Sequence, residues 1–394
     1  MTGLLARTRE PGAWLWLALA LGAALRIYLV VATQGSFDVA IKLHHGSQVN
    51  RLGLLEYYRQ APVFNHPPPM GGFFAAAASL AAETGIPFRV WLRAPFAALD
   101  LATAWLLLQA FAASPWRLAI FAAYWLHPLA ILFSAYHGNT DTAVAFFALL
   151  SLVGVAAGRS AAAGAALGIG LWVKLPVLMA APALCLALPG WGARARFAAA
   201  AAAVGLLGYL PALEQAPLVL DRIAGYGGSP VTTPSGLPIW GLAHVLGFAD
   251  TAAGRWLERA NAIVCLVPIV WLAWLRRGRS SAPEAGLTVC GGYLAVYGLS
   301  SHFAWQYLAW SLPFWFCLDR RAAALLSAVV GAYVYGAYAL FTGSPWLAGR
   351  WDFTRYAAWP WPLAALRAAA VLACLAVAAW LLASELRRRR GLRA

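Results

Sequence analysis

The sequence predicts an all-α polytopic membrane protein, a bundle of about 11–12 transmembrane helices. Three observations lead to this fold class. The 394 residues are 62% hydrophobic and only 11% charged, whereas soluble domains are about a quarter charged. The mean hydropathy is +0.69. Apolar runs of roughly 15–20 residues recur to the end of the chain, so residues 1–394 are expected to form a single integral membrane domain.

The net charge of +15 comes from arginines that lie between the apolar runs. Cytoplasmic loops of membrane proteins are enriched in such residues, so the charge indicates topology and nucleic-acid binding is not expected. The first apolar run, Ala13–Ala32, follows Arg7 and Arg9 and has no small-residue cleavage site after it. This pattern favours a retained signal anchor over a cleaved signal peptide.

Arginine clusters set the expected topology, with both termini in the cytoplasm. Lys174 and Pro176 divide the apolar run 161–189 into two short helices, because proline removes a backbone donor. The run 69–82 is expected to be re-entrant or interfacial; if 69–86 crosses the membrane instead, one later short segment cannot. The expected helices are 13–33, 94–112, 118–134, 142–157, 161–173, 176–189, 198–213, 258–275, 285–300, 303–318, 322–341 and 363–383.

The polar segments gather on the non-cytoplasmic face under this topology. Irregular polar backbone persists near a membrane only where it faces water or a cavity, so one external active site built from these loops is expected. The segments are 34–69 (the first external loop), 134–141, Lys174, 214–257, 300–306 and 342–362.

No motif for a nucleotide or a metal ion is present in the sequence. There is no Walker A sequence or dinucleotide fingerprint, and the glycine-rich stretch 163–170 is typical of small-residue helix packing. The five cysteines lack CxxC spacing and are expected to be free thiols. An enzyme acting outside the cell would then need a lipid-carried activated donor, with no cofactor and no metal.

The first external loop holds a dense set of titratable groups. Asp38 lies where a carboxylate could take a proton from an attacking hydroxyl, although it could also be a solvated loop acid or a helix N-cap. His44 and His45 follow about two turns later, and one of them can share a helix face with Asp38. Asn65 and His66 precede three prolines that stiffen the end of the loop. The two residues here and the two histidines of the preceding sentence are candidate substrate-binding residues.

A second polar cluster lies between two apolar runs. Tyr136, His137, Asn139 and Asp141 offer the hydrogen bonds that sugar hydroxyls require. The alternative is a polar turn in which Asp141 caps the helix that begins at Thr142. Capping and sugar binding are compatible with each other.

Two further candidates concern a phosphate group. Lys174 is one of two lysines in the chain, and a compact ammonium near the outer surface suits a phosphate. Snorkelling of its side chain to the membrane interface is the alternative. His302 and Gln306 are four residues apart and are expected to share one side of a helix, where they could hold phosphate oxygens. Tyr307 beside them is explained equally well as an interface anchor.

Together these stretches resemble glycosyltransferase superfamily C, the polytopic enzymes that use polyprenyl-phosphate sugars. The likeness is greatest to GPI mannosyltransferase I and its bacterial relatives, and it covers most of residues 25–315. It rests on Asp38, HPLAILFSAYHGNTD (127–141), LGIGLWVKLPVLMAAP (167–182) and WQYLAWSLP (305–313). The exit Asn65-His66-Pro67-Pro68 also resembles the dolichyl-phosphate-glucose enzymes of asparagine-linked glycan assembly.

The resemblance implies a GT-C-type transmembrane bundle whose external loops form the active site. It places Asp38 as the catalytic base, with Lys174 and His302 near the donor phosphate. One departure is that related mannosyltransferases carry Asp-x-Asp in the first loop, whereas this chain has Ser36-Phe37-Asp38. Either one acid suffices, or a partner such as Asp141 replaces the other.

The function implied is an inverting hexosyltransferase of the bacterial plasma membrane. It would move a hexose, mannose in preference to glucose, from a polyprenyl phosphate to a lipid-linked or glycolipid acceptor on the non-cytoplasmic face. Its partners would be these substrates and membrane lipids, and a monomer is expected. A transporter or flippase for lipid-linked sugars is an alternative, but it would require an internal repeat, which is not seen. A non-catalytic assembly partner is another, and it would tolerate loss of Asp38.

Overall fold

The computed structural model describes residues 12–226, 228–233, 236–354 and 360–391. Within these ranges the chain forms helices and connecting loops, and it contains no named strand. Two isolated β-bridges, Pro230–His302 and Thr232–Pro238, are the β-type pairings of the described residues. The predicted all-α fold class is confirmed.

The helices follow one another along the chain with breaks at glycine and proline. In the first half they are α1 (Ala13–Ala32), α2 (Phe37–Leu52), α3 (Leu54–Gln60), α4 (Pro68–Thr84), α5 (Phe88–Ala110), α6 (Arg117–Trp125), α7 (Pro128–Ile131), the π-helix η1 (Leu132–His137), α8 (Asp141–Ala156), α9 (Ser160–Val173), the 3-10 helix η2 (Leu175–Ala180) and α10 (Ala181–Ala187). In the second half they are α11 (Gly190–Leu207), η3 (Leu210–Gln215), α12 (Ala216–Ala224), α13 (Leu242–Val245), α14 (Ala252–Arg259), α15 (Asn261–Leu275), α16 (Ala282–Leu299), η4 (Trp305–Trp310), η5 (Leu312–Cys317), α17 (Arg320–Thr342) and α18 (Trp361–Gly391).

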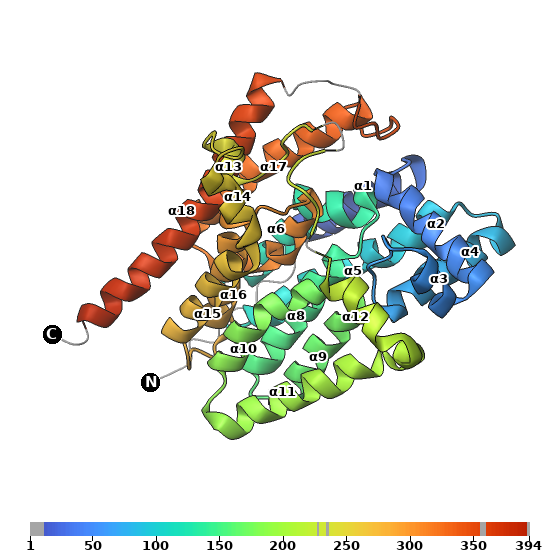
Figure 1. The fold of residues 1–394 in the computed structure, drawn as a ribbon. Helices are drawn as coiled ribbons and strands as arrows, with labels where there is room; N and C mark the ends of the chain where they lie inside the picture. Colours follow the sequence, from blue (N-terminus) through green and yellow to red (C-terminus); the bar gives the residue numbers. More distant parts are fainter. Residues whose placement is uncertain (1–11, 227, 234–235, 355–359, 392–394) are drawn as a thin grey trace.

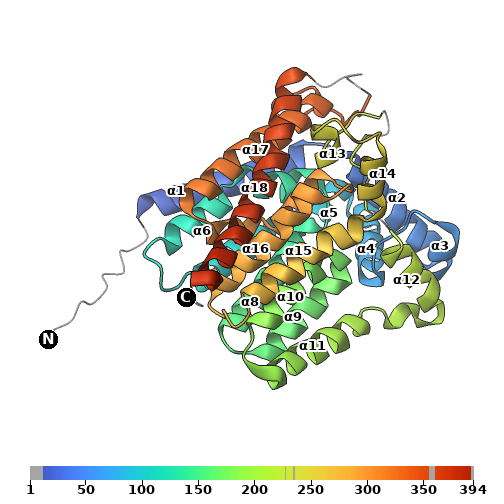
Figure 2. The ribbon, with the colours of Figure 1, turned by 60° about the vertical axis from the view of Figure 1, so that its left-hand side comes forward.

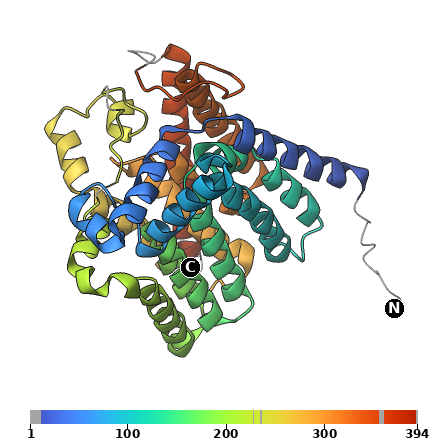
Figure 3. The same cartoon turned by 90° about the vertical axis from the view of Figure 1, so that its right-hand side faces the viewer.

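The helices form one bundle with α2, α3 and α4 on one side. Figure 1 shows α2, α3 and α4 gathered opposite the long C-terminal helix α18. In Figure 2, α8, α9, α15 and α16 lie side by side, and the last of these packs against α18. Figure 3 shows the N-terminal end of α1 projecting from the body of the bundle. The site described below lies between α2 and the residues next to the start of α8 and the end of α9.

Four helices are long and apolar enough to cross a membrane, namely α1, α5, α17 and α18. Three bent pairs raise the count to seven if each pair is a single span. Three more apolar segments, Asp141–Ala156, Ser160–Val173 and Leu175–Ala187, are shorter. This count, made on the described residues, supports a polytopic membrane bundle. The 11–12 predicted crossings and the re-entrant or interfacial placement of 69–82 stay predictions.

Two predicted external loops contain helices that a search for apolar runs cannot detect. The segment 34–69 holds α2 and α3, and 214–257 holds α12, α13 and the larger part of α14. The Ser36 side chain accepts a hydrogen bond from the backbone N–H of Asp38, and so caps α2. Gly53 ends the helix in a conformation with φ of 78°. Of the third predicted loop, 342–362, residues 355–359 lie outside the described residues.

The predicted interruption at Lys174 is confirmed. Helix α9 ends at Val173, Lys174 is extended with φ −170° and ψ 141°, and η2 begins at Leu175 with Pro176 in its first turn. The five cysteines are free thiols, as expected.

The predicted helix 303–318 is wrong. Two short 3-10 helices, η4 and η5, replace it and meet at Ser311. Pro313 has no N–H to donate to a continuing α-helix. The predicted helix 118–134 is also divided, because Pro128 follows a break after α6 and the two parts are bent by 45°.

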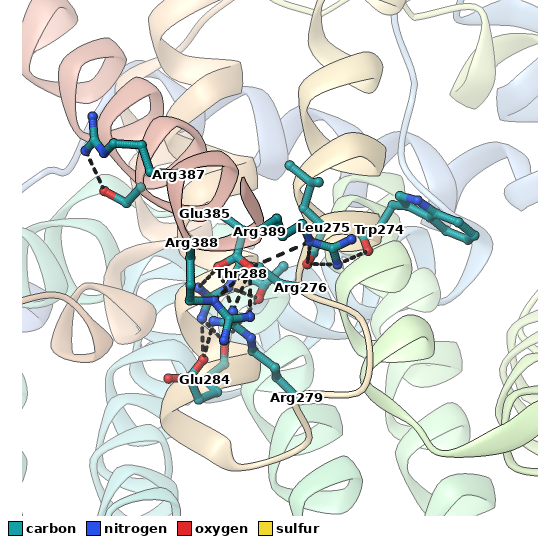
Figure 4. Close-up of polar contacts among 11 residues, drawn as sticks. Trp274, Leu275, Arg276, Arg279, Glu284, Thr288, Glu385, Arg387, Arg388 and Arg389 are labelled. Atoms are coloured by element: carbon teal, nitrogen blue, oxygen red, sulfur yellow. Dashed lines mark hydrogen bonds and ion pairs between the residues drawn. The ribbon is translucent and has the colours of Figure 1, made fainter. Parts of the chain in front are cut away.

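An ion-pair cluster joins α15, α16 and α18 at the predicted cytoplasmic end (Figure 4). The buried carboxylate of Glu385 lies 2.7 Å from Arg279, 2.9 Å from Arg388 and 3.4 Å from Arg276. Arg276 also contacts Glu284 at 2.6 Å. None of these residues lines the cavities described below, so the cluster holds helices together away from the site.

Candidate active site

A polar cavity of about 630 Å³ lies between α2, the loop before α4 and the start of η4. Nine of the thirteen predicted site residues line it, and they come from five separate parts of the chain. These nine are Asp38, His44, His45, Asn65, His66, Asn139, Lys174, Gln306 and Tyr307.

Asp38 is held by three groups that all approach one of its carboxylate oxygens. Lys42 Nζ lies 3.2 Å from Oδ2, His137 Nε2 lies 3.3 Å from it, and the Asn139 side-chain amide donates to it. Within the described part of the chain no hydrogen bond is made to Oδ1. The side chain is 26% exposed and lines the polar cavity. Oδ1 is therefore free to accept a proton from a bound hydroxyl.

The surroundings keep Asp38 ionised. Burial alone would raise the pKa of the carboxyl, but the charge of the buried Lys42 and the neighbouring His137 outweigh it, so the pKa lies well below its usual range. The pKa of Lys42 is lowered by burial, although Asp38 opposes the shift. The sequence analysis did not select Lys42, but its position four residues after Asp38 on one helix is a signal that would have found it.

Tyr136 and His137 support the site and do not line the cavity. The Tyr136 side chain is buried, and its hydroxyl donates to the carbonyl of Gly35 over 3.2 Å. The His137 ring lies between Asp38 and the hydroxyl of Tyr338, which contacts its Nδ1. We had expected both residues to contact a sugar directly, but the structure places them behind the cavity wall.

Asp141, Lys174 and Trp310 form a second charged group. Lys174 Nζ lies 3.0 Å and 3.3 Å from the two oxygens of Asp141, and Trp310 Nε1 donates to Oδ1 over 2.6 Å. Asp141 is 1% exposed and does not line the cavity, so its carboxylate contacts Lys174 from behind the cavity wall. The helix α8 begins at Asp141 itself, with Thr140 as its N-cap residue. No sequence signal singled out Trp310.

The Lys174 ammonium lies at the wall of the polar cavity. It is 17% exposed and sits 5.0 Å from the centre of the Tyr307 ring. Burial lowers the pKa of Lys174, but the charge and hydrogen bond of Asp141 outweigh burial, and the pKa is raised. The ammonium therefore stays charged and can meet an anion in the cavity.

An apolar cavity of about 500 Å³ adjoins the polar one. The two share Asn65, Lys174, Tyr226 and Tyr307 as lining residues. The walls of the second cavity are otherwise mainly aliphatic, with residues from η2, α12, α15 and α16. A charged group thus stands where a polar space meets an apolar one.

His302 and Gln306 do not share a helix side, which corrects the prediction. His302 precedes η4 and pairs with Pro230 in a β-bridge. It lines the apolar cavity, whereas Gln306 lines the polar one. Burial lowers the pKa of His302. The 3.6-residue spacing fails here because η4 begins at Trp305, after His302.

The wall formed by α2 and the loop before α4 carries the neutral imidazoles of His45 and His66. His45 Nδ1 lies 2.6 Å from the Tyr57 hydroxyl, and burial lowers the pKa of His45 to about 4. His66 is 8% exposed, its Nδ1 has no partner among the described residues, and burial lowers its pKa well below the usual value. His44 is more exposed at the cavity rim. Neutral imidazoles can donate or accept hydrogen bonds with sugar hydroxyls.

Comparison with known proteins identifies the family. The sequence profile of glycosyltransferase family 87 matches residues 64–300, more than half of the chain. The match includes His66, Asn139, Asp141 and Lys174, and it begins after Asp38. No curated protein matches the chain, so the likeness to GPI mannosyltransferase I stays an expectation. The chain therefore belongs to glycosyltransferase family 87, a GT-C-type family of membrane glycosyltransferases.

Proposed function

We propose that the chain transfers a hexose, with mannose as the first candidate, from a polyprenyl-phosphate donor to a lipid-linked or glycolipid acceptor. The observation that supports this most directly is the pairing of an ionised Asp38 and a charged Lys174 on one polar cavity that continues into an apolar one. The polar cavity, the Lys174 ammonium and the apolar cavity follow one another in the same order as the three parts of a lipid-linked sugar phosphate. These parts are a polar sugar, an anion and an apolar chain.

The reaction proposed is a single displacement with inversion. The acceptor hydroxyl oxygen attacks the anomeric carbon, and the bond from that carbon to the phosphate oxygen breaks. The electron pair leaves on the phosphate, and the hydroxyl proton passes to Oδ1 of Asp38. Negative charge grows on the phosphate in the transition state, where the ammonium of Lys174 stabilises it. We expect no metal ion and no cofactor, because lysine supplies the charge that the leaving group needs.

The donor would lie across the junction of the two cavities. Its phosphate would contact Lys174, its isoprenoid chain would occupy the apolar cavity beside His302, and its hexose would occupy the polar cavity. Asn65, His66 and Gln306 would hydrogen-bond the hexose hydroxyls there. Glucose is the second sugar to test, because Asn65 and His66 come from the stretch that resembles the glucosyl enzymes.

The site is proposed to face the non-cytoplasmic side of a bacterial plasma membrane, with the protein as a monomer. The arginine distribution supports this orientation, since the cluster at 276–279 and the terminal cluster at 387–390 lie in segments predicted to be cytoplasmic. The cavity is formed by segments at the predicted outer ends of the helices.

The test is direct transfer in detergent. Purified protein is incubated with radiolabelled polyprenyl-phosphate mannose or glucose and a membrane lipid extract, and glycosylated lipid is identified. Asp38→Asn should lower the transfer rate by about 10²–10⁴, whereas Asp250→Asn, which changes an exposed acid of a predicted external loop, should not. Transfer from a nucleotide sugar but not from a polyprenyl phosphate would refute the donor class. More than a tenth of the normal rate in Asp38→Asn would place the base elsewhere.

A further inference from the structure

The two segments that form the Asp38 site are distant in the sequence. Asp38 and Asn139 are 101 residues apart, and they meet because the end of α1 lies against the end of η1. We infer that Arg93, on α5, is the positioning residue that holds these two ends in register and so sets the geometry of Asp38. This inference rests on the proposed role of Asp38 as the base.

All five N–H groups of Arg93 are used. The side chain is 0% exposed, and each bond goes to an uncharged oxygen. Nε donates to the carbonyl of Arg89 over 3.0 Å; Nη1 donates to Thr33 Oγ1 and to the carbonyl of Tyr136, each over 3.1 Å; Nη2 donates to the carbonyls of Val30 and Thr33 over 2.8 and 2.7 Å.

These bonds join the two segments at the residues that precede the site. The single atom Nη1 contacts both segments, because Thr33 comes shortly before Asp38 in the chain and Tyr136 comes shortly before Asn139. Two further bonds cross the same junction: Ser36 Oγ donates to the carbonyl of His137 over 2.6 Å, and the Tyr136 hydroxyl donates to Gly35.

Glycine is required at the junction. Gly35 has φ of 82°, and a Cβ there would lie 2.9 Å from the Tyr136 carbonyl and 3.0 Å from Arg93 Nη1. The backbone at Gly35 is therefore packed closely against the Arg93 guanidinium and the Tyr136 carbonyl.

The contrast with Arg26 supports a specific role for Arg93. Both are buried in candidate membrane spans, where an ionised group is costly. Arg26 pairs with Asp100 over 2.8 Å, whereas among the described residues no carboxylate pairs with Arg93. A guanidinium without a counter-ion is explained by what it bridges, because an amide or an apolar residue could not bond five acceptors in three segments at once.

The first experiment measures hydrogen–deuterium exchange and does not depend on activity. Arg93→Lys keeps the charge but presents at most three donors in a different geometry. In detergent without substrate, backbone exchange should become faster in peptides covering 33–41 and 135–142 together. The matched control is Arg276→Lys, another buried arginine, which should affect only the cluster of Figure 4. The inference would be overturned if Arg93→Lys made exchange faster in neither segment. It would also be overturned if Arg276→Lys made exchange faster in both of these segments.

The second experiment separates positioning from general loss of structure. A misplaced base should lower kcat by roughly ten- to hundredfold, while the KM for the donor changes by less than about threefold because Lys174 and the apolar cavity are untouched. Tyr136→Phe removes one hydroxyl from the same junction and is the milder variant, expected to lower kcat in the same direction. An increased donor KM with unchanged kcat in both variants would refute the positioning role. If wild-type protein transfers no hexose, the proposed function fails, but the exchange result still decides whether Arg93 joins the two segments.

Discussion

Whether the charge of Lys174 contributes to donor binding can be tested only if its buried partner Asp141 is replaced at the same time. Replacing Lys174 by Met leaves Asp141 buried with Trp310 as its remaining hydrogen-bond donor among the described residues. Breaking a buried ion pair in this way typically costs about 3–5 kcal/mol. The single variant should therefore be markedly less stable whatever the ammonium does for the substrate, and its lost activity alone would prove nothing.

The double variant Lys174→Met/Asp141→Asn separates the two effects. It removes both charges, and the side-chain oxygen of the introduced asparagine can still accept the Trp310 N–H, so most of the lost stability should return. The donor phosphate would still lack its charge-assisted contact, worth about 1.5–3 kcal/mol. This corresponds to roughly ten- to hundredfold weaker use of the donor. Lys174→Arg should recover only part of the loss, because a planar fork does not occupy the place of a point charge.

The assay has two measurements on each protein in the same detergent. Thermal unfolding reports the stability, and transfer rate against donor concentration reports donor use. We expect the order of stability to be wild type, then the double variant, then the single variant. Dependence on acceptor concentration should change little, because the acceptor hydroxyl is brought to Asp38. A stable double variant with wild-type donor dependence would refute the phosphate role and leave Lys174 a structural partner of Asp141.

Three further predictions use other parts of the structure. Asp38→Glu should retain less than a tenth of the transfer rate, since the longer side chain cannot keep its bonds to both Lys42 and Asn139; a near-normal rate would show that the carboxylate position is not critical. Cysteine introduced at the exposed Ser47 should react with an impermeant reagent in intact cells, and cysteine at the exposed Ala157 only after permeabilisation; the reverse pattern would invert the topology. His45 has a pKa of about 4 in the folded protein, below its unfolded value of about 6.5, so the unfolded state binds more protons in between and stability should fall as the pH drops from about 6.5 to 4. His45→Gln should flatten part of that fall in melting temperature, and an unchanged slope would assign it to other groups.

Part of the candidate site could be selected from residue type and position alone. Titratable groups are scarce in so apolar a chain, so Asp38, Lys174 and the histidines of the first external loop stand out against their surroundings. The break at Lys174 was equally local, because Pro176 cannot continue an α-helix. Lys42 was missed although the sequence placed it one helical turn from Asp38, and it would have been found once 37–52 was known to be helical.

The sequence by itself determined the all-α membrane class, because apolar run length and charge content act on each segment separately. Only the tertiary structure decided which polar groups line the cavity and which contact each other. Asp141 accepts hydrogen bonds from Lys174 and Trp310, and Tyr136 donates one to Gly35. Arg93 bonds two segments at once. All these contacts join residues far apart in the chain. No local pattern encodes such contacts, because buried polar groups are paired by where the packed helices bring them.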